Sequence, residues 1–430
     1  MRRLFNCAAA LLALAANQAS AQDMEIVNAT VATGDGSEPI MDGVVVIEGG
    51  KVVYAGPQAG AGNFESGTAI DAGGKWVTPG MVAAVTNLGL LDVGAVDPSN
   101  DAGAAKARFN AALDIATAIN PASQHVLVGR ARGITRAVVT GNPGGSIFAG
   151  QGAVIDTGAD PQPITRARAF QFVTLSENGA QIAGGSRSAS HVELRNALRE
   201  ARDFAAGRWQ GDDNLLTRAD AEALGPVVTG KQKLFVEAHR ASDLRAVLAL
   251  KREFAALDLV LVGATEGWLV ADEIAAAKVP VIAESLQDLP QSFEQLAATQ
   301  SNIGRMRSAG VIVAVNAATI ENMHHLAQHA GNLVALGRIP GATGLSWGEA
   351  LAAITSVPAR IAGFGGKLGV LAPGAAGDVV MWDGDPLEVS SAPVQVFIDG
   401  IEQPLDSHQS RLRDRYRDLD ESDLPKAYDR

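Results

Sequence analysis

The first 80 residues carry short apolar runs in which β-branched side chains are common. Glycine pairs separate several of these runs, at Gly49-Gly50 and Gly73-Gly74, and such pairs are typical of tight hairpin turns. The pattern predicts five strands, at Met24 to Val31, Gly43 to Ile47, Lys51 to Gly56, Thr68 to Asp71 and Lys75 to Val77. We interpret residues 22–80 as the N-terminal part of a small β-sandwich, not as a parallel sheet.

Between residues 81 and 364, continuous apolar runs alternate with segments of helical periodicity. The predicted strands are Met81 to Val85, Arg136 to Thr140, Lys233 to Ala238, Asp258 to Val262, Pro280 to Ala283 and Val311 to Asn316; the predicted helices include 191–206, 242–256 and 269–277. Such alternation is typical of a parallel sheet covered by helices on both faces. The length of the region and the lack of a dinucleotide fingerprint favour an α/β TIM (β/α)8 barrel over residues 81–364, with a doubly wound sheet as the alternative.

After residue 365 the chain again has a strand-like pattern. The predicted strands are Gly369 to Leu371, Asp378 to Trp382 and Val394 to Ile398. We expect residues 365–406 to complete the β-sandwich, which is then a composite of both termini. The tail, residues 407–430, is rich in charge and poor in apolar periodicity, and it predicts a solvated helix or a frayed end.

The N-terminus has the features of a secretory signal peptide over residues 1–21. Arg2 and Arg3 precede an apolar run from Leu4 to Ala16, and Ala19-Ser20-Ala21 fits a cleavage site. The run is too short to span a bilayer of about 30 Å, although an uncleaved anchor is the alternative. Cys7 is the only cysteine and lies in this segment, so the mature chain has no disulfide. These features predict a secreted protein of the periplasm.

Charge limits the partners of the mature chain. Removal of Arg2 and Arg3 from the 35 basic residues leaves 33 against 47 acidic ones, a net charge of −14. Such a chain repels nucleic acid and anionic membranes, so we predict neither as a partner.

Four stretches resemble the amidohydrolase superfamily, in its imidazolonepropionase-like and prolidase-like branch. They are residues 70–80, which end in Val77-Thr78-Pro79-Gly80; residues 350–360, which end in Pro358-Ala359-Arg360; residues 367–380, which include Pro373-Gly374 and Asp378-Val379-Val380; and residues 382–400, which begin with Trp382-Asp383-Gly384-Asp385-Pro386. Together they span almost the whole mature chain. All of them are scaffold positions, so the resemblance implies the fold more strongly than the chemistry.

The resemblance implies a metal site at the carboxyl ends of the barrel strands, and this chain lacks most of its ligands. The histidine pair expected after the first strand falls on Val85 and Asn87, and the histidine after the sixth strand falls on Gly263. The aspartate after the eighth strand falls on Ala318 or its neighbour Asn316. Valine, glycine and alanine offer no ligand, and asparagine offers only a weak carbonyl oxygen. We therefore predict no cofactor; Zn or another divalent metal would bind only in a repurposed site.

A few polar residues remain as ligand-binding candidates. His239 follows the predicted fifth strand, where the resemblance implies a histidine, and Glu237 shares its face of that strand. Glu266 and Glu284 follow the next two strands, Asn87 follows the first strand, and Glu177 is a loose candidate for the mid-barrel Lys or Glu. Each of these residues also has a purely structural interpretation, as a polar group at a strand end or a surface carboxylate. No catalytic residue is assigned.

Two further patterns have weaker functional interpretations. His325 and His329 are four residues apart, so a helix would place them on one face, but the same segment fits an ordinary surface helix. The glycine-rich stretch from Gly141 to Gly152 lacks the lysine of a phosphate-binding loop. It is either a turn with little side chain or a loop that presents backbone to a substrate on the functional face.

Three interpretations of function are open. The resemblance implies a hydrolase of carbon–nitrogen bonds in small cyclic amides or dipeptide-like substrates. The residues favour a pseudoenzyme, a periplasmic barrel with little or no metal-dependent activity that binds a small-molecule ligand. The third interpretation is a structural subunit that forms a hetero-oligomer with an active paralogue, and a homo-oligomer is also open.

Overall fold

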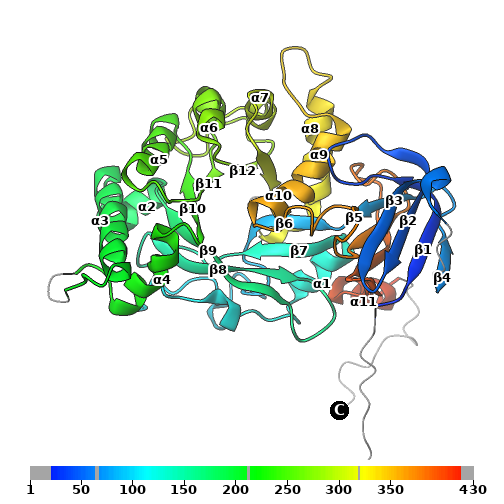
Figure 1. Cartoon of the computed structure of the whole chain (residues 1–430), viewed down its shortest axis with the longest axis horizontal. Coiled ribbons are helices and arrows are strands. Elements are labelled where there is room, and N and C mark those ends of the chain that lie inside the picture. Colours follow the sequence, from blue (N-terminus) through cyan, green and yellow to red (C-terminus); the bar gives the residue numbers. More distant parts are fainter. Residues whose placement is uncertain (1–20, 63–66, 211–213, 318–319, 418–430) are drawn as a thin grey trace, which may run out of the picture.

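Eight strands in the middle of the chain form one sheet whose spatial order follows the sequence, β6 to β13 (Figure 1). The computed structural model describes residues 21–62, 67–210, 214–317 and 320–417. Most of the predicted signal peptide, with Cys7, lies outside these ranges, as does Ala318. The strands are β6 (Met81–Thr86), β7 (Ile134–Val139), β8 (Phe148–Asp156), β9 (Ile164–Thr174), β10 (Lys233–Ala238), β11 (Leu259–Gly263), β12 (Val281–Glu284) and β13 (Val313–Asn316).

The sheet curls into a nearly closed barrel, which confirms the predicted fold class. Its first and last strands meet where the backbone N–H of Val85 donates to Oδ1 of Asn316 at 3.3 Å. The pairs from β9 to β13, and the pair β6–β7, are parallel.

One strand differs from the simple (β/α)8 pattern. β8 runs antiparallel to both β7 and β9, and no helix lies between these three strands in the described chain. The sequence pattern missed β8 because Gly150 and Gly152 interrupt its apolar run. Gly152 has a packing role, since a side chain there would collide with the ring of Phe170 on β9. The predicted glycine-rich loop is therefore shorter than expected, and its last residues belong to β8.

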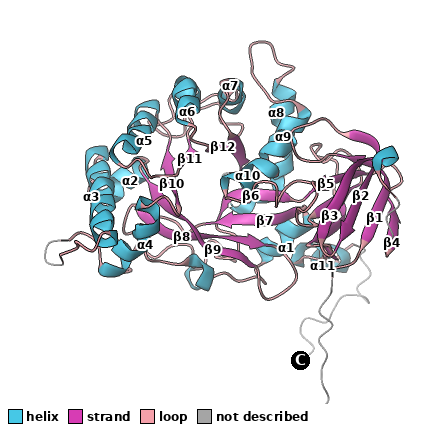
Figure 2. Ribbon diagram, viewed as in Figure 1, coloured by secondary structure: helices cyan, strands magenta, loops and turns pink. Residues whose placement is uncertain are grey.

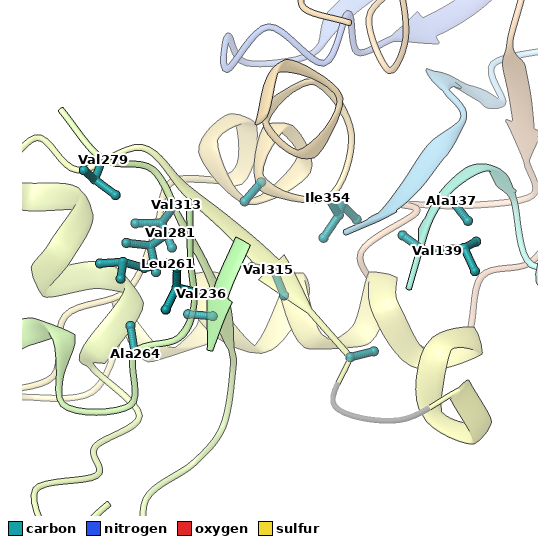
Figure 3. Packing of buried hydrophobic residues seen from close by; sticks show 14 of the residues in the cluster. Ala137, Val139, Val236, Leu261, Ala264, Val279, Val281, Val313, Val315 and Ile354 are labelled. Atoms are coloured by element: carbon teal, nitrogen blue, oxygen red, sulfur yellow. The ribbon is translucent and has the colours of Figure 1, made fainter. Parts of the chain in front are cut away.

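Alternation along the strands separates an inner and an outer core. Phe235, Val260 and Ile282 belong to the buried cluster inside the barrel, whereas Val236, Leu261 and Val281 belong to the cluster beneath the helices. Figure 3 shows the outer cluster, in which Val236, Leu261, Val281 and Val313 come from four neighbouring strands. The inner cluster also contains Ala359, Ile361, Ala362, Phe364 and Leu368. This segment plugs the amino end of the barrel and leaves the carboxyl end as the open one.

The helices cover the outside of the barrel, as Figure 2 shows for α3, α5, α6 and α7. They are α1 (Gln124–Ala131), α2 (Glu177–Ile182), α3 (Arg187–Ala205), α4 (Arg218–Val228), α5 (Ala241–Glu253), α6 (Ala271–Ala277), α7 (Asn302–Ser308), α8 (Leu326–Leu336), α9 (Trp347–Ala353), α10 (Ser356–Ile361) and α11 (His408–Arg415). α3 illustrates the local cause. Ser186 caps its first turn by accepting from the N–H of Ala189, and Leu194, Ala197, Leu198 and Ala201 form its buried stripe.

The two terminal segments form a second sheet in the order β16-β15-β14-β5-β1-β2-β3, with β4 also paired to β1. Its strands are β1 (Met24–Val31), β2 (Ile40–Glu48), β3 (Lys51–Pro57), β4 (Thr68–Asp71), β5 (Trp76–Pro79), β14 (Val379–Trp382), β15 (Pro393–Ile398) and β16 (Ile401–Glu402). The antiparallel pair β5–β14 joins the N-terminal and C-terminal halves. Ile26, Val45 and Phe397 share one buried cluster there, so the two halves share a core.

One predicted strand is wrong. Residues 369–371 form a turn, because Gly369 adopts a φ of +65° and its Cα packs against the carbonyl of Thr355. The short helix α11 forms in the charged tail. In the described ranges, no helix has the length and apolarity required to cross a bilayer.

A buried ionic contact locks the terminal sheet to the barrel. Arg136 on β7 donates from Nε to Oδ2 of Asp378 at 2.6 Å and from Nη2 to Oδ1 of Asp378 at 2.9 Å. Its Nη2 also donates to Oδ1 of Asp399 at 2.7 Å. Only 4% of the Arg136 side chain and 2% of the Asp378 side chain are exposed. Every nitrogen of the guanidinium faces a partner, since Nη1 contacts Thr165.

Candidate functional site

The carboxyl end of the barrel, which we call the mouth, holds a pocket of about 160 Å³, the mouth pocket. Strand parity puts Glu237, Glu284 and Asn316 on the inner face, because they follow Phe235, Ile282 and Ala314 of the inner cluster by two residues. The complete lining is Val85, Thr86, Asn87, Thr140, Gly141, Asn142, Pro143, Phe172, Glu237, His239, Val262, Gly263, Glu284 and Asn316. The structure thus brings four of the predicted binding candidates, Asn87, Glu237, His239 and Glu284, into one pocket.

The ring of His239 lies directly over Gly263. A Cβ added to Gly263 would come within 2.4 Å of Cε1 of His239, so no side chain fits at residue 263 while the ring keeps this position. Gly263 also has a φ of +86°, which side chains rarely adopt. The absence of a side chain at the end of β11 is therefore what allows His239 to lie across the pocket wall.

Hydrogen bonds orient this imidazole. Its Nδ1 lies 2.9 Å from Oγ1 of Thr265, and the Thr265 hydroxyl donates to Oε1 of Gln287 at 3.1 Å. Because a hydroxyl has only one hydrogen, Thr265 accepts from Nδ1–H of His239. The other ring nitrogen, Nε2, then faces Oε1 of Glu237 at 3.9 Å. Neighbours thus hold His239 in one orientation, with Nε2 toward the carboxylate.

Glu237 and His239 shift each other's pKa. Burial alone would raise the pKa of Glu237, but His239 and the hydroxyls of Thr174 and Ser176 lower it below its usual value. Burial alone would lower the pKa of His239, but the carboxylates of Glu237, Glu294 and Glu284 raise it. The two directions agree, and both favour a carboxylate beside an imidazolium. The Glu237 side chain keeps 31% exposure because it faces the pocket.

Glu284 adds a second acid to the pocket. Burial raises its pKa above the usual value, the charge of His239 partly offsets this rise, and Glu237 adds to it. Oε2 of Glu284 accepts from Nε2 of Gln287 at 2.6 Å. A hydrogen-bonded chain therefore runs from Glu284 through Gln287 and Thr265 to His239. Burial favours the protonated form of the Glu284 carboxyl group more than in a solvated glutamate.

Amide side chains occupy the places where the resemblance implies metal ligands. Nδ2 of Asn87 donates to the carbonyl of Thr140 at 2.6 Å and to Oδ1 of Asn142 at 3.2 Å. Asn316, at the end of the last strand, accepts from the backbone of Val85. Both side chains tie neighbouring strand ends together.

The glycine-rich loop serves mainly as a contact surface for the long segment after β6. Added Cβ atoms at Gly145 and Gly150 would lie 2.3 Å from the carbonyl oxygen of Ala105 and 2.6 Å from that of Leu113. The glycines therefore allow this segment to cover the loop closely. Only Gly141, Asn142 and Pro143 reach the mouth pocket, where they could present backbone to a ligand.

Two predicted candidates lie outside the pocket lining. Glu266 is buried, and its carboxylate accepts from the backbone N–H of Ala241 at 2.9 Å and of Ala297 at 3.1 Å. It holds the start of α5 and a loop. Glu177 begins α2 and contacts Arg187 at 3.5 Å.

The sequence pattern did not identify Glu294 as a residue near the mouth, because Glu294 lies in a loop far from the end of any predicted strand. Its Oε2 accepts from the N–H of Glu177 at 2.8 Å and from Nη2 of Arg187 at 3.0 Å. Its charge contributes to the raised pKa of His239.

The histidines after the last strand do not form a cluster with the mouth residues. His329 on α8 interacts through Nδ1 with Oγ of Ser285 at 2.7 Å, whereas His325 is exposed. Burial, followed by the charge of His325, lowers the pKa of His329.

The donor set does not fit the metal site that the resemblance implies. Val85, Asn87, Gly263 and Asn316 replace the ligands, and the ring of His239 fills the space above Gly263. Across the described ranges, no three His, Cys, Asp or Glu side chains come together in a way that could hold an ion. No chemical step through a metal is therefore derived for this pocket.

Comparisons with known proteins agree on one scaffold. A profile of the amidohydrolase family matches residues 336–401. Over 396 residues the chain is 23% identical to the amidohydrolase tasK of Hapsidospora irregularis, and the match covers 84% of this chain and 40% of that protein. Over 61 residues it is 46% identical to the imidazolonepropionase of Caulobacter vibrioides strain NA1000 / CB15N, covering 14% of this chain and 15% of that protein. The chain thus spans well under two thirds of these two relatives.

A solved structure extends the similarity to nearly the whole fold. The amidohydrolase from Thermotoga maritima MSB8 superposes with a TM-score of 0.77 at 22% identity, covering 88% of this chain and 99% of that one. At this identity the likeness concerns the fold alone.

Proposed function

Since the chain is a member of the amidohydrolase superfamily, we propose that its mouth pocket binds a small molecule that carries an amide-type carbon–nitrogen group. The hydrolysis of such bonds is the reaction class implied by the superfamily. We further propose that this chain has little or no metal-dependent hydrolytic activity. The observation that carries the proposal is the packing of His239 over Gly263, in a pocket whose remaining expected ligand positions hold Val85, Asn87 and Asn316.

The pocket chemistry suits such a ligand. Glu237 and Glu284 present acceptors to ligand N–H groups, and the Asn87 and Asn142 amides supply further polar contacts. When protonated, His239 supplies one donor, Nε2–H, for a carbonyl oxygen. A pocket of about 160 Å³ limits the bound group to a few heavy atoms. These contacts orient a ligand, and Glu237 is also placed to accept a proton.

Elemental analysis tests the proposal directly. Purified protein should contain far less than one Zn, Mn or Fe per chain, and addition of Zn or Mn should not produce hydrolysis of cyclic amides or dipeptides. One or two ions per chain, with activity that a chelator removes, would contradict it.

Ligand binding should be measured separately, with hydantoin and acetamide as probes. A Glu237→Gln, Glu284→Gln double variant should bind hydantoin and acetamide more weakly than wild type. Glu266→Gln is unsuitable as a control, although Glu266 lies outside the pocket lining, because the Glu266 carboxylate accepts from two backbone amides. Glu222→Gln, at an exposed position on α4, is the suitable control.

Three exposed apolar side chains in the loop after β12 favour a second candidate, a subunit that pairs with another amidohydrolase-type chain. Leu289, Phe293 and Leu296 are 78%, 83% and 65% exposed, and they follow β12 at the open end of the barrel. Large apolar side chains gathered on a surface often mark a contact with another protein.

Oligomeric state tests this second candidate. Light scattering should show a complex with a co-expressed intact paralogue, and Leu289→Ser with Phe293→Ser should dissociate it. Val192→Ser, at another apolar position that is 68% exposed on α3, is the matched control. A monomer that co-purifies with nothing would count against pairing.

A further inference from the structure

A second and larger cavity, of about 490 Å³, lies at the other end of the barrel. Residues Val311 to Val313 line it, whereas Asn316 on the same chain segment lines the mouth pocket. A strand rises about 3.3 Å per residue, so about 10 Å of β13 separates Val313 from Asn316. This cavity, which we call the base cavity, is distinct from the mouth. Its volume lies within the range of roughly 300–1,000 Å³ that is typical of small-molecule sites.

The wall of the base cavity is mainly apolar and comes from segments far apart in the sequence. Ile303 on α7, Leu345 before α9, Val357 on α10 and Val370 in the following turn all line it. Asp35 comes from the loop between β1 and β2. A molecule in this cavity would therefore contact both the barrel and a loop of the terminal sheet.

The two acids of the base cavity already have partners. Oε1 of Glu349 contacts Arg307 at 3.2 Å, and Oε2 accepts from the N–H of Ser346 at 3.1 Å. Oδ1 of Asp35 accepts from the N–H of Ser37 at 2.9 Å. Burial alone would raise the pKa of Asp35, but hydrogen bonds from Ser37 and Thr33 lower it, so this carboxylate is ionised and internally satisfied.

Arg360 differs from these charged groups. It lines the cavity, is exposed, and has no carboxylate within ion-pair distance among the residues that the structure describes. Its stem packs beside Gly365, where an added Cβ would lie 3.3 Å from Cγ of Arg360. A guanidinium is always charged, and its planar set of N–H donors matches a carboxylate in a bidentate contact.

We propose that the base cavity binds a small apolar carboxylate. The carboxylate pairs with Arg360, and the apolar body packs against Ile303, Leu345 and Val357. Arg307 and Glu349 offset each other and Asp35 accepts from Ser37, so Arg360 is the charged group left to select among ligands. It repels a cation, and a neutral molecule of the same shape lacks the ionic contact. Because such a ligand touches the barrel and the loop around Asp35 in the folded state alone, it also stabilises the fold. This inference does not depend on the proposed function of the mouth pocket.

Three probes of one shape and different charge test the proposal. They are benzoate, benzyl alcohol and benzylamine, added to the full-length mature chain and measured by calorimetry and thermal unfolding. Benzoate should bind with a Kd at least tenfold lower than benzyl alcohol and should raise the Tm by a few degrees at saturation. Benzylamine should bind more weakly than either.

Variants assign the binding to the base cavity. Arg360→Gln should weaken benzoate binding at least tenfold and leave benzyl alcohol binding unchanged. Arg338→Gln, at an exposed arginine outside the cavity, should change neither. Glu284→Gln, which alters the mouth, should also leave benzoate binding unchanged. Equal benzoate affinity in wild type and Arg360→Gln would overturn the proposal, as would benzoate binding no tighter than benzyl alcohol.

Discussion

Two clusters of acids in this molecule, at the Arg136 junction and at the barrel mouth, differ in their partners. At the junction, a guanidinium holds both oxygens of Asp378 and one of Asp399 at 2.6–2.9 Å. At the mouth, the titratable imidazole of His239 faces Glu237 at 3.9 Å across an open pocket. At the junction every guanidinium nitrogen of Arg136 already has a partner, whereas at the mouth Glu237 and His239 face an open pocket. Charged side chains therefore stabilise the scaffold where other protein groups already pair with them, and they are available to bind a ligand where they face an open pocket.

Removal of the junction cation should have the largest effect. Arg136→Met leaves Asp378 buried without its counter-charge, and such losses cost about 3–5 kcal/mol of unfolding free energy. Chemical unfolding measures this loss. Arg132→Met, at an exposed arginine nearby, is the control and should change stability by less than about 0.5 kcal/mol. If both variants unfold alike, the junction is not the lock that its geometry indicates.

Substitution of Gly263 should have the next largest effect and should act on the mouth. Gly263→Ala meets both an unfavourable φ of +86° and the His239 ring at 2.4 Å, and we expect it to cost about 2–3 kcal/mol. Gly310→Ala is the matched control, because its φ is +88° and an added Cβ meets nothing within 4 Å. The difference between the two free energies of unfolding isolates the contact with His239. Equal costs would show that the ring moves away freely.

The junction also contains a poorly stabilised acid. Burial raises the pKa of Asp156 to about 6 from an ordinary value of 3.8, although Arg136 opposes the rise from 3.8 Å. A raised acid pKa means that the folded state holds its proton more tightly than the unfolded state. Stability therefore falls as pH rises from about 4 to about 6.

Asp156→Asn should remove this pH dependence. Since an amide oxygen can still accept from the N–H of Gly158, the variant should be more stable than wild type by about 1–2 kcal/mol above pH 6 and no more stable below pH 4. Unfolding curves across that range provide the measurement. A variant that is less stable at pH 7 would mean that Arg136 needs this carboxylate.

The pair at the mouth, Glu237 and His239, should have the smallest effect on stability. Its contribution rises with pH at the acidic end of the range and falls with pH at the other end. The raised pKa of His239 contributes stability below its ordinary value of 6.5, which is lost as pH rises through the folded-state value. The lowered pKa of Glu237 contributes stability above its ordinary value of 4.5, which is lost as pH falls. The pair thus stabilises most between about pH 4.5 and 6.5.

Comparison of wild type with Glu237→Gln measures this contribution. We expect a difference of less than about 1 kcal/mol, greatest inside that window, because the Glu237 side chain is 31% exposed and solvent screens the pair. Glu253→Gln, far from the mouth on α5, provides a surface ion-pair control. A difference that does not change with pH would mean that the two groups do not interact.

The sequence by itself determined the barrel and the location of its open-end chemistry. A continuous apolar run placed β10 at residues 233–238 with the same bounds that the structure has, and the two-residue repeat of a strand put Glu237 and His239 on one face. The stretches around Pro79-Gly80 and Pro358-Ala359-Arg360 resemble the superfamily and align the chain with its metal-ligand positions. This alignment identified Val85, Asn87 and Gly263 as replacements of metal ligands. The strand and its faces follow from local periodicity, which a single sequence shows directly, whereas the expected ligand positions are implied by the resemblance to the amidohydrolase superfamily.

Only the tertiary structure decided which polar groups meet. The direction of β8, the capping role of Glu266 and the approach of Glu294 to the mouth all depend on contacts between distant segments. Asn316 reaches Val85 across 231 positions of the chain, and the His239 ring lies over a glycine 24 residues away because a missing side chain leaves room there. Periodicity fixes the face on which a side chain lies but not its distance from residues on other strands, so the barrel had to close before the site could be described.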